Sequence, residues 1–339
     1  MPASPPCLRR GRQQASTMRN LNGYRAPAWL RGAHAQTIYP LLRKGPLPAY
    51  RRSRWDTPDG DFIDLDWLRD TPSAEAPLVV LFHGLEGSSA SHYARALMHF
   101  VARRGWAGAV VHFRGCSGCL NRLPRAYHSG DSAEADWVLR RLRALHPGRR
   151  LYVTGVSLGG NVLLKWLGEQ GCRAESVVDA AAAVCAPVDL AAAGAALQRG
   201  ANMIYTHHFL QTLKRHALRR LERHPGLYDR HRVLAARTLH DFDDAVTAPL
   251  HGFRNADDYW ARASSKPWLP HVTVPTLMLN ALNDPFLPPA ALPAPQQVAR
   301  ALTLEYPDEG GHVGFVAGVF PGHLDWLPAR LLHFFERGA

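Results

Sequence analysis

The chain has few cysteines and no long apolar run, and both scarcities limit what it can be. Its 339 residues include five cysteines, an odd number, so no framework of paired disulfides indicates a small secreted scaffold and reduced thiols are expected. No apolar stretch reaches the roughly 18 to 20 residues that a membrane-spanning helix needs, and Asp179 interrupts the richest one, at 176–188. The sequence therefore predicts no transmembrane helix.

The N-terminal segment also lacks a feature, the apolar core of roughly 7 to 15 residues that a secretory signal needs. A cytoplasmic location follows as the expectation. Residues 1–17 are expected to form a disordered extension without a role of their own, and Met18 is an alternative start to Met1, because ordered-looking sequence begins only after it.

Acidic residues are scarce relative to basic ones, with 28 Asp and Glu against 40 Lys and Arg and a net charge of +12. Such a balance can indicate nucleic-acid binding, but no zinc-finger spacing, RNP-like aromatic motif or basic zipper accompanies it. We therefore expect no nucleic-acid partner. Half of the positive excess lies in residues 214–237, where eight Lys and Arg stand against two acidic residues.

Short apolar runs separated by helical patterns dominate the rest of the chain. In residues 62–67 one side of the chain carries Ile63, Leu65 and Trp67, and the other side carries Phe62, Asp64 and Asp66. This period of two predicts a half-exposed strand near a sheet edge. The later runs are short and rich in apolar, often β-branched residues, which suits strands buried on both faces; they lie at 77–82, 108–113, 151–155, 177–185, 275–281 and 302–306. Helical patterns occupy 92–103, 131–145, 159–169 and 324–335. This alternation predicts an α/β fold with a mostly parallel sheet and helices on both faces.

Residues 188–270 interrupt the alternation, since they contain helical patterns and no clear strand. We expect a helical lid insertion over the carboxyl edge of the sheet, within a single domain at 18–339. Apolar residues recur there at helical spacing, with basic residues expected on the remaining faces; the stripe is Leu210, Leu213, Ala217 and Leu221.

The sequence Gly-Val-Ser-Leu-Gly at 155–159 links the strand predicted at 151–155 to the helix predicted at 159–169. A sharp strand-to-helix turn exposes a serine hydroxyl, and the positions two residues before and after it must be very small because strand and helix nearly touch. Helix N–H groups behind Ser157 would also favour a developing oxyanion. We therefore predict that Ser157 is a nucleophile rather than part of an ordinary turn.

A serine nucleophile needs a histidine base that a carboxylate orients, in the chain order Ser, acid, His for this type of fold. His312 lies in the loop after the last predicted strand and is preceded by two glycines, so it is the favoured base. Asp284 follows the preceding strand and is the favoured acid. Asp308 and Glu309 are rivals, but neighbours so close in sequence rarely fold back onto the histidine ring.

Two backbone N–H groups should bind the oxyanion, one from the residue after the nucleophile and one from a loop after an earlier strand. Leu158 supplies the first. Leu85 is the choice for the second, because it follows Gly84 directly after the strand at 77–82. His83 is expected to be a scaffold of that loop and not a base.

With these residues in place, the sequence resembles α/β hydrolases and, more narrowly, the YheT-like esterases of the AB hydrolase 4 type. The resemblance extends from about Pro27 to the C-terminus and rests on seven ordered motifs, at 30–40, 82–89, 112–118, 155–161, 240–253, 283–288 and 311–315. It implies an esterase-like triad of Ser157, Asp284 and His312, with no cofactor and no metal. Relatives often carry another residue at the position of Cys119.

The resemblance implies a carboxylic-ester hydrolase acting on short- to medium-chain acyl esters or lipids through an acyl-enzyme. An acyltransferase that passes the acyl group to an alcohol is an alternative on the same triad, and a noncatalytic protein with a basic binding surface is a further one. The basic insertion could both cover the acyl pocket and contact anionic membranes, or be a solvated lid. The oligomeric state and the natural substrate stay open.

Overall fold

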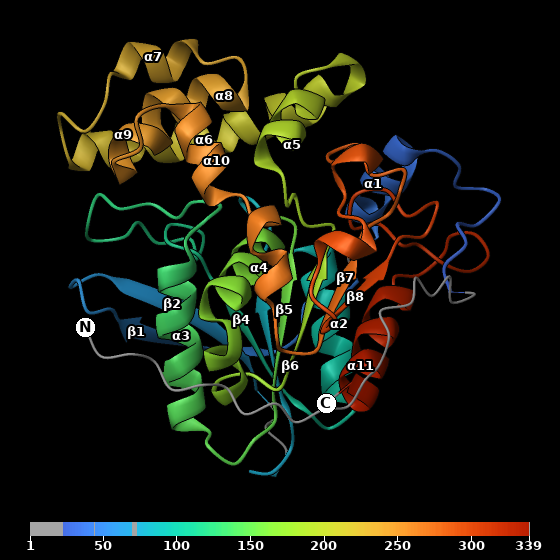
Figure 1. The fold of residues 1–339 in the computed structure, drawn as a ribbon. Coiled ribbons are helices and arrows are strands. Elements are labelled where there is room, and N and C mark those ends of the chain that lie inside the picture. Colours follow the sequence, from blue (N-terminus) through green and yellow to red (C-terminus); the bar gives the residue numbers. More distant parts are fainter. Residues whose placement is uncertain (1–22, 44, 70–72, 339) are drawn as a thin grey trace.

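The apolar runs form neighbouring strands of one eight-stranded sheet in a computed structural model that describes residues 23–43, 45–69 and 73–338 (Figure 1). The predicted extension at 1–17 and the alternative start at Met18 lie outside the described residues. The strand order is β1-β2-β4-β3-β5-β6-β7-β8. The strands are β1 (Tyr50–Asp56), β2 (Phe62–Leu68), β3 (Leu78–Phe82), β4 (Ala107–Val111), β5 (Leu151–Val156), β6 (Ala180–Val184), β7 (Thr276–Leu279) and β8 (Leu302–Glu305).

Six of the strands, β3 to β8, run parallel, whereas β2 is antiparallel to both β1 and β4. Helices cover both faces. On one face α3 (Ser132–Leu145) and α4 (Leu158–Gln170) pack on alternate strand residues; on the other, α2 (His92–Arg103) and α11 (Trp326–Gly338) pack on the intervening ones (Figure 1). Strands β3 to β7 are largely apolar because both of their faces are buried. The predicted α/β class with a mostly parallel, doubly covered sheet is confirmed.

The alternating run at 62–67 forms β2, but the expectation of a half-exposed strand is wrong. Asp64 and Asp66 are only 2% and 3% exposed. The edge strand is β1, whose Arg54 and Arg52 hold the two carboxylates at 2.8 and 2.7 Å. Paired arginines make these buried aspartates tolerable, which the alternation of apolar and acidic residues in one strand does not reveal.

Helices fill the chain between β6 and β7 and lie beyond the carboxyl ends of the strands (Figure 1). They are α5 (Leu190–Leu197), α6 (Met203–Arg223), α7 (Arg230–Ala235), α8 (Leu239–Phe242), the π-helical turn η3 (Asp243–Thr247), α9 (Ala248–His251) and α10 (Ala256–Ala263). We call residues 190–263 the helical cover. Helix α1 (Ala33–Leu42) lies beside the loops that follow β7 and β8. The short 3-10 helices are η1 (Gly171–Ser176), η2 (Gly200–Asn202), η4 (Lys266–His271), η5 (Pro289–Ala291) and η6 (Pro295–Gln297).

The apolar stripe of α6 faces the other helices of the cover. Leu210 and Ala217 are buried in a cluster with Val233, Phe242 and Val246. The expectation that every basic residue of this segment lies on the remaining, outer faces is wrong for Arg220, which is 8% exposed. None of the described helices is long and apolar enough to cross a membrane.

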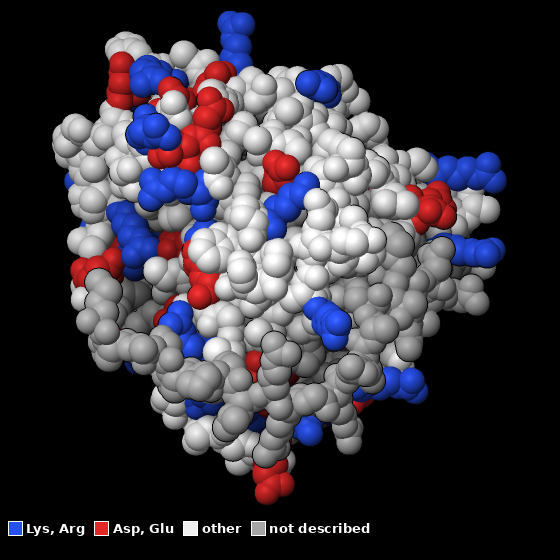
Figure 2. Space-filling model, in the orientation of Figure 1, with Lys and Arg blue, Asp and Glu red and all other residues white. Residues whose placement is uncertain are grey.

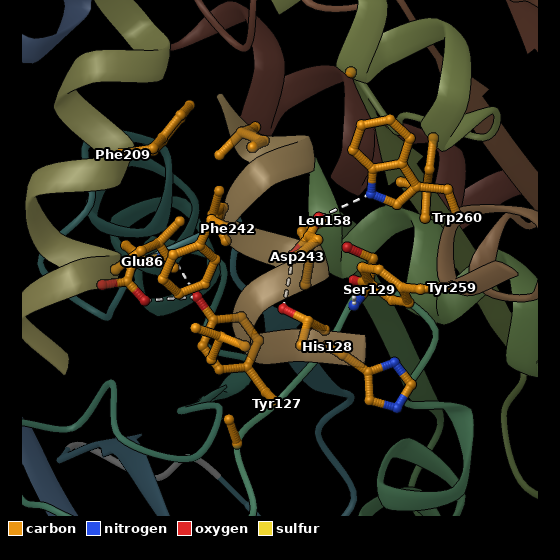
Figure 3. A pocket seen from close by; sticks show the side chains of 18 of the residues that line it. Glu86, Tyr127, His128, Ser129, Leu158, Phe209, Phe242, Asp243, Tyr259 and Trp260 are labelled. Atoms are coloured by element: carbon orange, nitrogen blue, oxygen red, sulfur yellow. Dashed lines mark hydrogen bonds between the residues drawn. The ribbon is translucent and has the colours of Figure 1, made fainter. Parts of the chain in front are cut away.

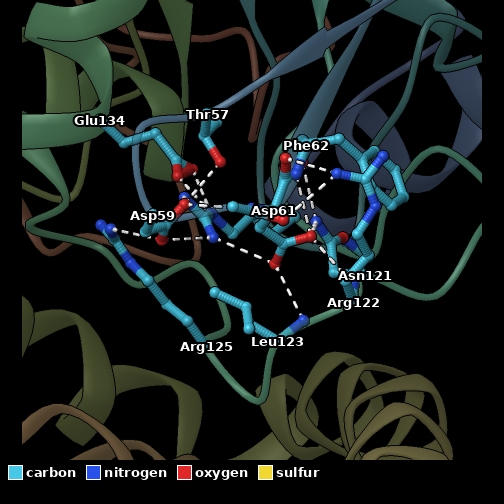
Figure 4. A network of polar contacts seen from close by, with 12 residues as sticks. Thr57, Asp59, Asp61, Phe62, Asn121, Arg122, Leu123, Arg125 and Glu134 are labelled. Carbon is cyan, nitrogen blue, oxygen red and sulfur yellow. Dashed lines mark hydrogen bonds and ion pairs between the residues drawn. The ribbon is translucent and has the colours of Figure 1, made fainter.

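Arg114 ties the turn between β1 and β2 to α3, because the turn carries Asp59 and Asp61 and the helix carries Glu134 (Figure 4). Its buried guanidinium contacts Glu134 at 2.6 Å, Asp61 at 3.1 Å and Asp59 at 2.9 Å. Losing one member of such a buried network costs about 3 to 5 kcal/mol, because a charge is left without a partner. The network fixes the chain between Arg114 and Ser129, which forms one wall of the cavity described below.

Among the described residues, Cys116, Cys119 and Cys185 are free thiols, as expected. Cys172 is disulfide-bonded, so the expectation of reduced thiols is wrong at that position.

Candidate active site

Ser157 stands alone between β5 and α4, at the junction that the sequence predicts. Its backbone angles are φ 53° and ψ −121°, a left-handed conformation that side-chain-bearing residues rarely adopt. The N–H of Ser157 donates to the carbonyl of Val184 on β6 at 2.8 Å, which fixes the turn. A strained serine at a strand-to-helix turn presents its hydroxyl beyond the carboxyl ends of the strands.

The two glycines that flank Ser157 are required by close backbone contacts. A Cβ atom on Gly155 would stand 2.4 Å from the carbonyl oxygen of Gly159 in the helix. A Cβ atom on Gly159 would stand 2.4 Å from the carbonyl oxygen of Phe82, at the end of the neighbouring strand β3. Gly155 is therefore needed where β5 and α4 nearly touch, as the sequence predicts, whereas Gly159 is needed for the contact between α4 and β3.

Ser157, His312 and Asp284 form one hydrogen-bonded chain. His312 Nε2 lies 3.0 Å from Ser157 Oγ, and His312 Nδ1 lies 2.8 Å from Asp284 Oδ2. The other carboxylate oxygen of Asp284 accepts from the N–H of Phe286 at 2.8 Å. The Phe286 ring stacks on the imidazole with a centroid distance of 3.9 Å and so restricts its rotation. The three side chains from three separate loops therefore have the relative positions of a nucleophile, a base and an orienting acid.

The two rival carboxylates lie elsewhere. Asp308 is exposed, and Glu309 accepts a hydrogen bond from the Gln36 amide at 3.2 Å. Neither makes a hydrogen bond or ion pair with His312 among the described residues.

Leu85 and Leu158 both line the cavity that holds Ser157. Leu158 is the first residue of α4, and Gly84 packs against Ser157 so closely that a Cβ atom on Gly84 would lie 3.1 Å from the serine Cβ. The N–H groups on either side of Leu85 are occupied, because Gly84 donates to Tyr93 and Glu86 donates to Tyr127. In the described part of the chain, neither leucine N–H has a protein acceptor.

His83 supports this loop from beneath. It is fully buried, its Nδ1 lies 2.7 Å from the Gly84 carbonyl, and its Nε2 accepts from the N–H of Phe113 at 3.2 Å. These partners require the neutral tautomer with the proton on Nδ1. Burial lowers the pKa of His83 to about 3, and the charge of His112 adds to the effect. A neutral ring without contact to the serine fits the role of scaffold.

Comparison with known proteins identifies the fold and the group of relatives. The family described as the alpha/beta hydrolase fold matches residues 77–318. The protein of Escherichia coli (strain K12) that bears the name "Putative esterase YheT" is 38% identical over 303 residues, which cover 88% of each chain. Phospholipase ABHD3 of Mus musculus is 31% identical over 92% of this chain and 78% of its own. The esterase Pf2001 of Pyrococcus furiosus, 17% identical, superposes with a TM-score of 0.54 over 86% of this chain and 93% of its own.

The chain is an α/β hydrolase of the esterase and lipase type.

Two residues that no sequence pattern predicted hold the acid and base loops of the hydrolase together. Gln36 on α1 is fully buried, and its Oε1 accepts both from the Gly310 N–H at 2.9 Å and from the Asn283 amide at 2.8 Å. The neighbouring Thr37 hydroxyl accepts from the N–H of His312 at 2.9 Å. One helix thus braces the loop of Asp284 and the loop of His312. Both residues belong to the motif at 30–40, which carried the family resemblance but no assigned role.

A cavity of about 1120 Å³, including its opening to solvent, lies between the sheet and the helical cover of the hydrolase (Figure 3). Ser157, His312, Leu85 and Leu158 all line it. Its walls are largely apolar and come mostly from the helical cover, with Leu190, Ala193, Leu197, Phe209, Leu213, Leu239, Phe242, Val246, Leu250 and Trp260. Such walls suit an apolar chain next to a reactive hydroxyl.

Polar groups are embedded in the cavity walls as well. Asp243 accepts from the Thr247 hydroxyl at 2.6 Å and from the Trp260 indole at 2.8 Å, and burial raises the pKa of its carboxyl to about 6 (Figure 3). Burial lowers the pKa of His128 to about 3, with Arg125 adding to the effect, and burial and His128 lower the pKa of His251 to about 3. These two imidazoles are therefore neutral near pH 7.

In the described residues, the possible metal-ligand atoms of Cys185, Asp284 and His312 lie within 4.8 Å of one another. The Asp284 and His312 atoms are already joined by a hydrogen bond. Burial raises the pKa of the Cys185 thiol well above its usual value, so the thiolate that metals bind is disfavoured. The Cys185 sulfur instead accepts from the Val313 N–H at 3.3 Å, next to His312.

Replacing Gln36 with leucine should lower kcat by roughly 100-fold with little change in KM, because the loops that carry Asp284 and His312 lose their common brace and small displacements of reacting groups are costly. Steady-state kinetics with an activated ester measures the effect. Gln296→Leu, at an exposed position far along the chain, is the control and should behave as wild type. A Gln36→Leu variant with unchanged kcat would contradict the bracing role.

Proposed function

We propose that the protein is a serine carboxylic-ester hydrolase in which Ser157 is the nucleophile, His312 the base and Asp284 the orienting acid. The observation that carries the proposal is the continuous hydrogen-bonded chain from Asp284 to Ser157 at the floor of a largely apolar cavity. A hydroxyl, an imidazole and a buried carboxylate in this order can activate oxygen for acyl transfer.

In the first half of the reaction, Ser157 Oγ bonds to the ester carbonyl carbon and its proton passes to His312 Nε2. Asp284 stabilises the imidazolium through the hydrogen bond at Nδ1. The carbonyl oxygen becomes an oxyanion, for which the N–H groups of Leu85 and Leu158 are the proposed donors. The bond to the alcohol oxygen then breaks, and the alcohol leaves with the proton from His312. The product is an acyl-enzyme on Ser157.

In the second half, water attacks the acyl carbon and gives a proton to His312, and the tetrahedral intermediate releases the carboxylic acid while Ser157 Oγ regains the proton. An alcohol in place of water would give a new ester, which is the acyltransferase alternative. The atoms of the site serve both reactions equally, so the concentration and fit of the acceptor decide between them.

We propose short- to medium-chain acyl esters or lipids as the substrates. The largely apolar walls around Ser157 support this class, since an acyl chain would replace water against leucine, phenylalanine and tryptophan side chains. The names of the relatives, an esterase and a phospholipase, agree with it.

We also propose a cytoplasmic location, which the free thiols of Cys116, Cys119 and Cys185 support and the disulfide at Cys172 opposes.

The triad assignment predicts that Ser157→Ala lowers kcat/KM for an activated ester by roughly 10⁴-fold or more, because the nucleophile is lost. Asp284→Asn should also cause a large loss, since an amide cannot stabilise the imidazolium. Asp308→Asn is the matched control and should retain most of the activity, as Asp308 is exposed and does not contact His312. Equal, mild losses in both aspartate variants would mean that the acid is another residue.

We further propose that the helical cover contacts anionic membranes through its exposed basic residues alone. Arg215 and Arg219 are exposed on α6, whereas the apolar stripe of that helix is packed inside the cover and cannot insert into lipid. Lysines and arginines on the visible face of the cover are interspersed with acidic residues (Figure 2), and pairs such as Arg232 with Asp244 reduce the net attraction. The expected contact is therefore weak and electrostatic.

Wild-type enzyme should sediment better with anionic than with neutral vesicles at low salt, and the difference should fade as salt is added. Arg215→Glu and Arg219→Glu should each weaken this binding, since a basic residue near an anionic surface contributes roughly 1 kcal/mol. Arg173→Glu is the control, because Arg173 is exposed in η1 at the opposite edge of the sheet. Equal sedimentation of the wild type with both kinds of vesicle would disprove membrane contact.

A further inference from the structure

Arg220 is a buried cation in the wall of the catalytic cavity. It lies on α6, one residue after the exposed Arg219, but only 8% of its surface is exposed, and it lines the same cavity as Ser157 and His312. Burying a guanidinium away from water is costly unless an anion compensates it. The position therefore raises the question of which anion compensates Arg220.

No carboxylate of the described residues fills that role, because none lies within 4.0 Å of the Arg220 nitrogens. The cavity lining includes two carboxylates, and both have other partners (Figure 3). Glu86 pairs with His216 at 2.8 Å and accepts from the Tyr127 hydroxyl at 2.8 Å. Asp243 is bonded to Thr247 and Trp260.

Three titratable groups whose pKa values Arg220 lowers are neutral near pH 7. Burial raises the pKa of the Cys116 thiol and of the Tyr228 hydroxyl, and Arg220 opposes the shift in each case without reversing it. Burial and His128 lower the pKa of His251 to about 3, and Arg220 contributes to that lowering. A thiol, a phenol and an uncharged imidazole do not balance a positive charge.

Arg114 provides a contrast within the same cavity wall. It is also buried, at 4% exposure, but three carboxylates from Asp59, Asp61 and Glu134 surround its guanidinium (Figure 4). Arg114 thus has the surroundings of a structural cation, and Arg220 does not. Arg220 has the Tyr228 hydroxyl as a hydrogen-bond partner but no carboxylate among the described residues. Since the fold gives one buried arginine three carboxylates, the missing anion beside the other points to a ligand that is not part of the chain.

We propose that Arg220 is the anion-binding subsite of the catalytic cavity and that the preferred substrates are esters carrying a second, negatively charged oxygen group, a phosphate or a carboxylate, apart from the ester bond. The inference rests on the proposed ester hydrolysis at Ser157. A guanidinium binds either oxyanion through two parallel N–H donors, so one arginine serves both chemistries. The largely apolar walls would contact the hydrocarbon that joins the anionic group to the ester.

Binding is tested first, without catalysis, in the Ser157→Ala protein. Calorimetric titration with octyl phosphate and with octanoate should give saturable binding, and adding Arg220→Gln should weaken it by roughly 10- to 100-fold, the usual effect of losing a charged hydrogen bond. Adding Arg173→Gln instead is the control and should change nothing, because that side chain is exposed in η1 and does not line the cavity. Equal affinities in the Arg220→Gln and Arg173→Gln proteins, or no saturable binding, would overturn the proposal.

Titration with inorganic phosphate distinguishes a site for a free anion from a site for an anionic group on an amphiphilic substrate. If it binds as tightly as octyl phosphate and depends on Arg220, the site holds a free anion and the substrate inference is wrong. Weak binding of inorganic phosphate beside tight binding of octyl phosphate supports an amphiphilic substrate.

Catalytic preference is tested with mono-4-nitrophenyl adipate, which carries a free carboxylate, and its methyl ester, which does not. The wild type should favour the carboxylate in kcat/KM, and Arg220→Gln should reduce the ratio of the two values by roughly 10- to 100-fold. Arg220→Lys, which keeps the charge, should restore part of the ratio and also serves if the glutamine variant does not fold. An unchanged ratio in both variants would overturn the proposal. Failure to hydrolyse either ester would refute the proposed function, while the titrations would still decide the role of Arg220.

Discussion

The left-handed backbone of Ser157 is the constraint on which the site depends. It forces the chain to reverse between β5 and α4 within one residue, and the reversal presses α4 against the ends of β5 and β3. Only glycine fits at 155 and 159 under that pressure. The same turn places Ser157 and Leu158, the first residue of α4, in the cavity beyond the carboxyl ends of the strands. The loops that follow three other strands meet there.

The rest of the fold supplies partners at that point. The parallel strands end at a common edge, so the loops after β3, β7 and β8 bring Leu85, Asp284 and His312 to the serine. Gln36 and Thr37 on α1 hold the last two loops in register, and the Arg114 network holds the loop that faces them. The helical cover then encloses an apolar cavity above the hydroxyl, which gives an acyl chain a place to bind.

The sequence predicted those parts of the molecule that depend on local pattern. Runs rich in apolar residues predicted the six parallel strands because burial on both faces leaves few polar positions, and glycine spacing predicted the serine turn. Prediction from the sequence failed where a residue far away in the chain determines the burial or the role of a given residue. Asp64 and Asp66 predicted a half-exposed strand, but arginines of β1 pair with them and both are buried. Arg220 was expected to be exposed like its neighbours, but it lies in the interior. Gln36 gave no signal of its role, since its partners lie almost 250 residues or more away in the chain.

The most direct test of the account is the detection of an acyl-enzyme. Rapid mixing of the wild type with 4-nitrophenyl butyrate, acid quenching and intact-mass measurement should reveal a transient mass increase equal to one butyryl group, and peptide mapping should assign it to Ser157. The adduct should be absent from Ser157→Ala and should decay as butyrate is released. Release of nitrophenol without an adduct, or an adduct on another residue, would contradict nucleophilic catalysis by Ser157.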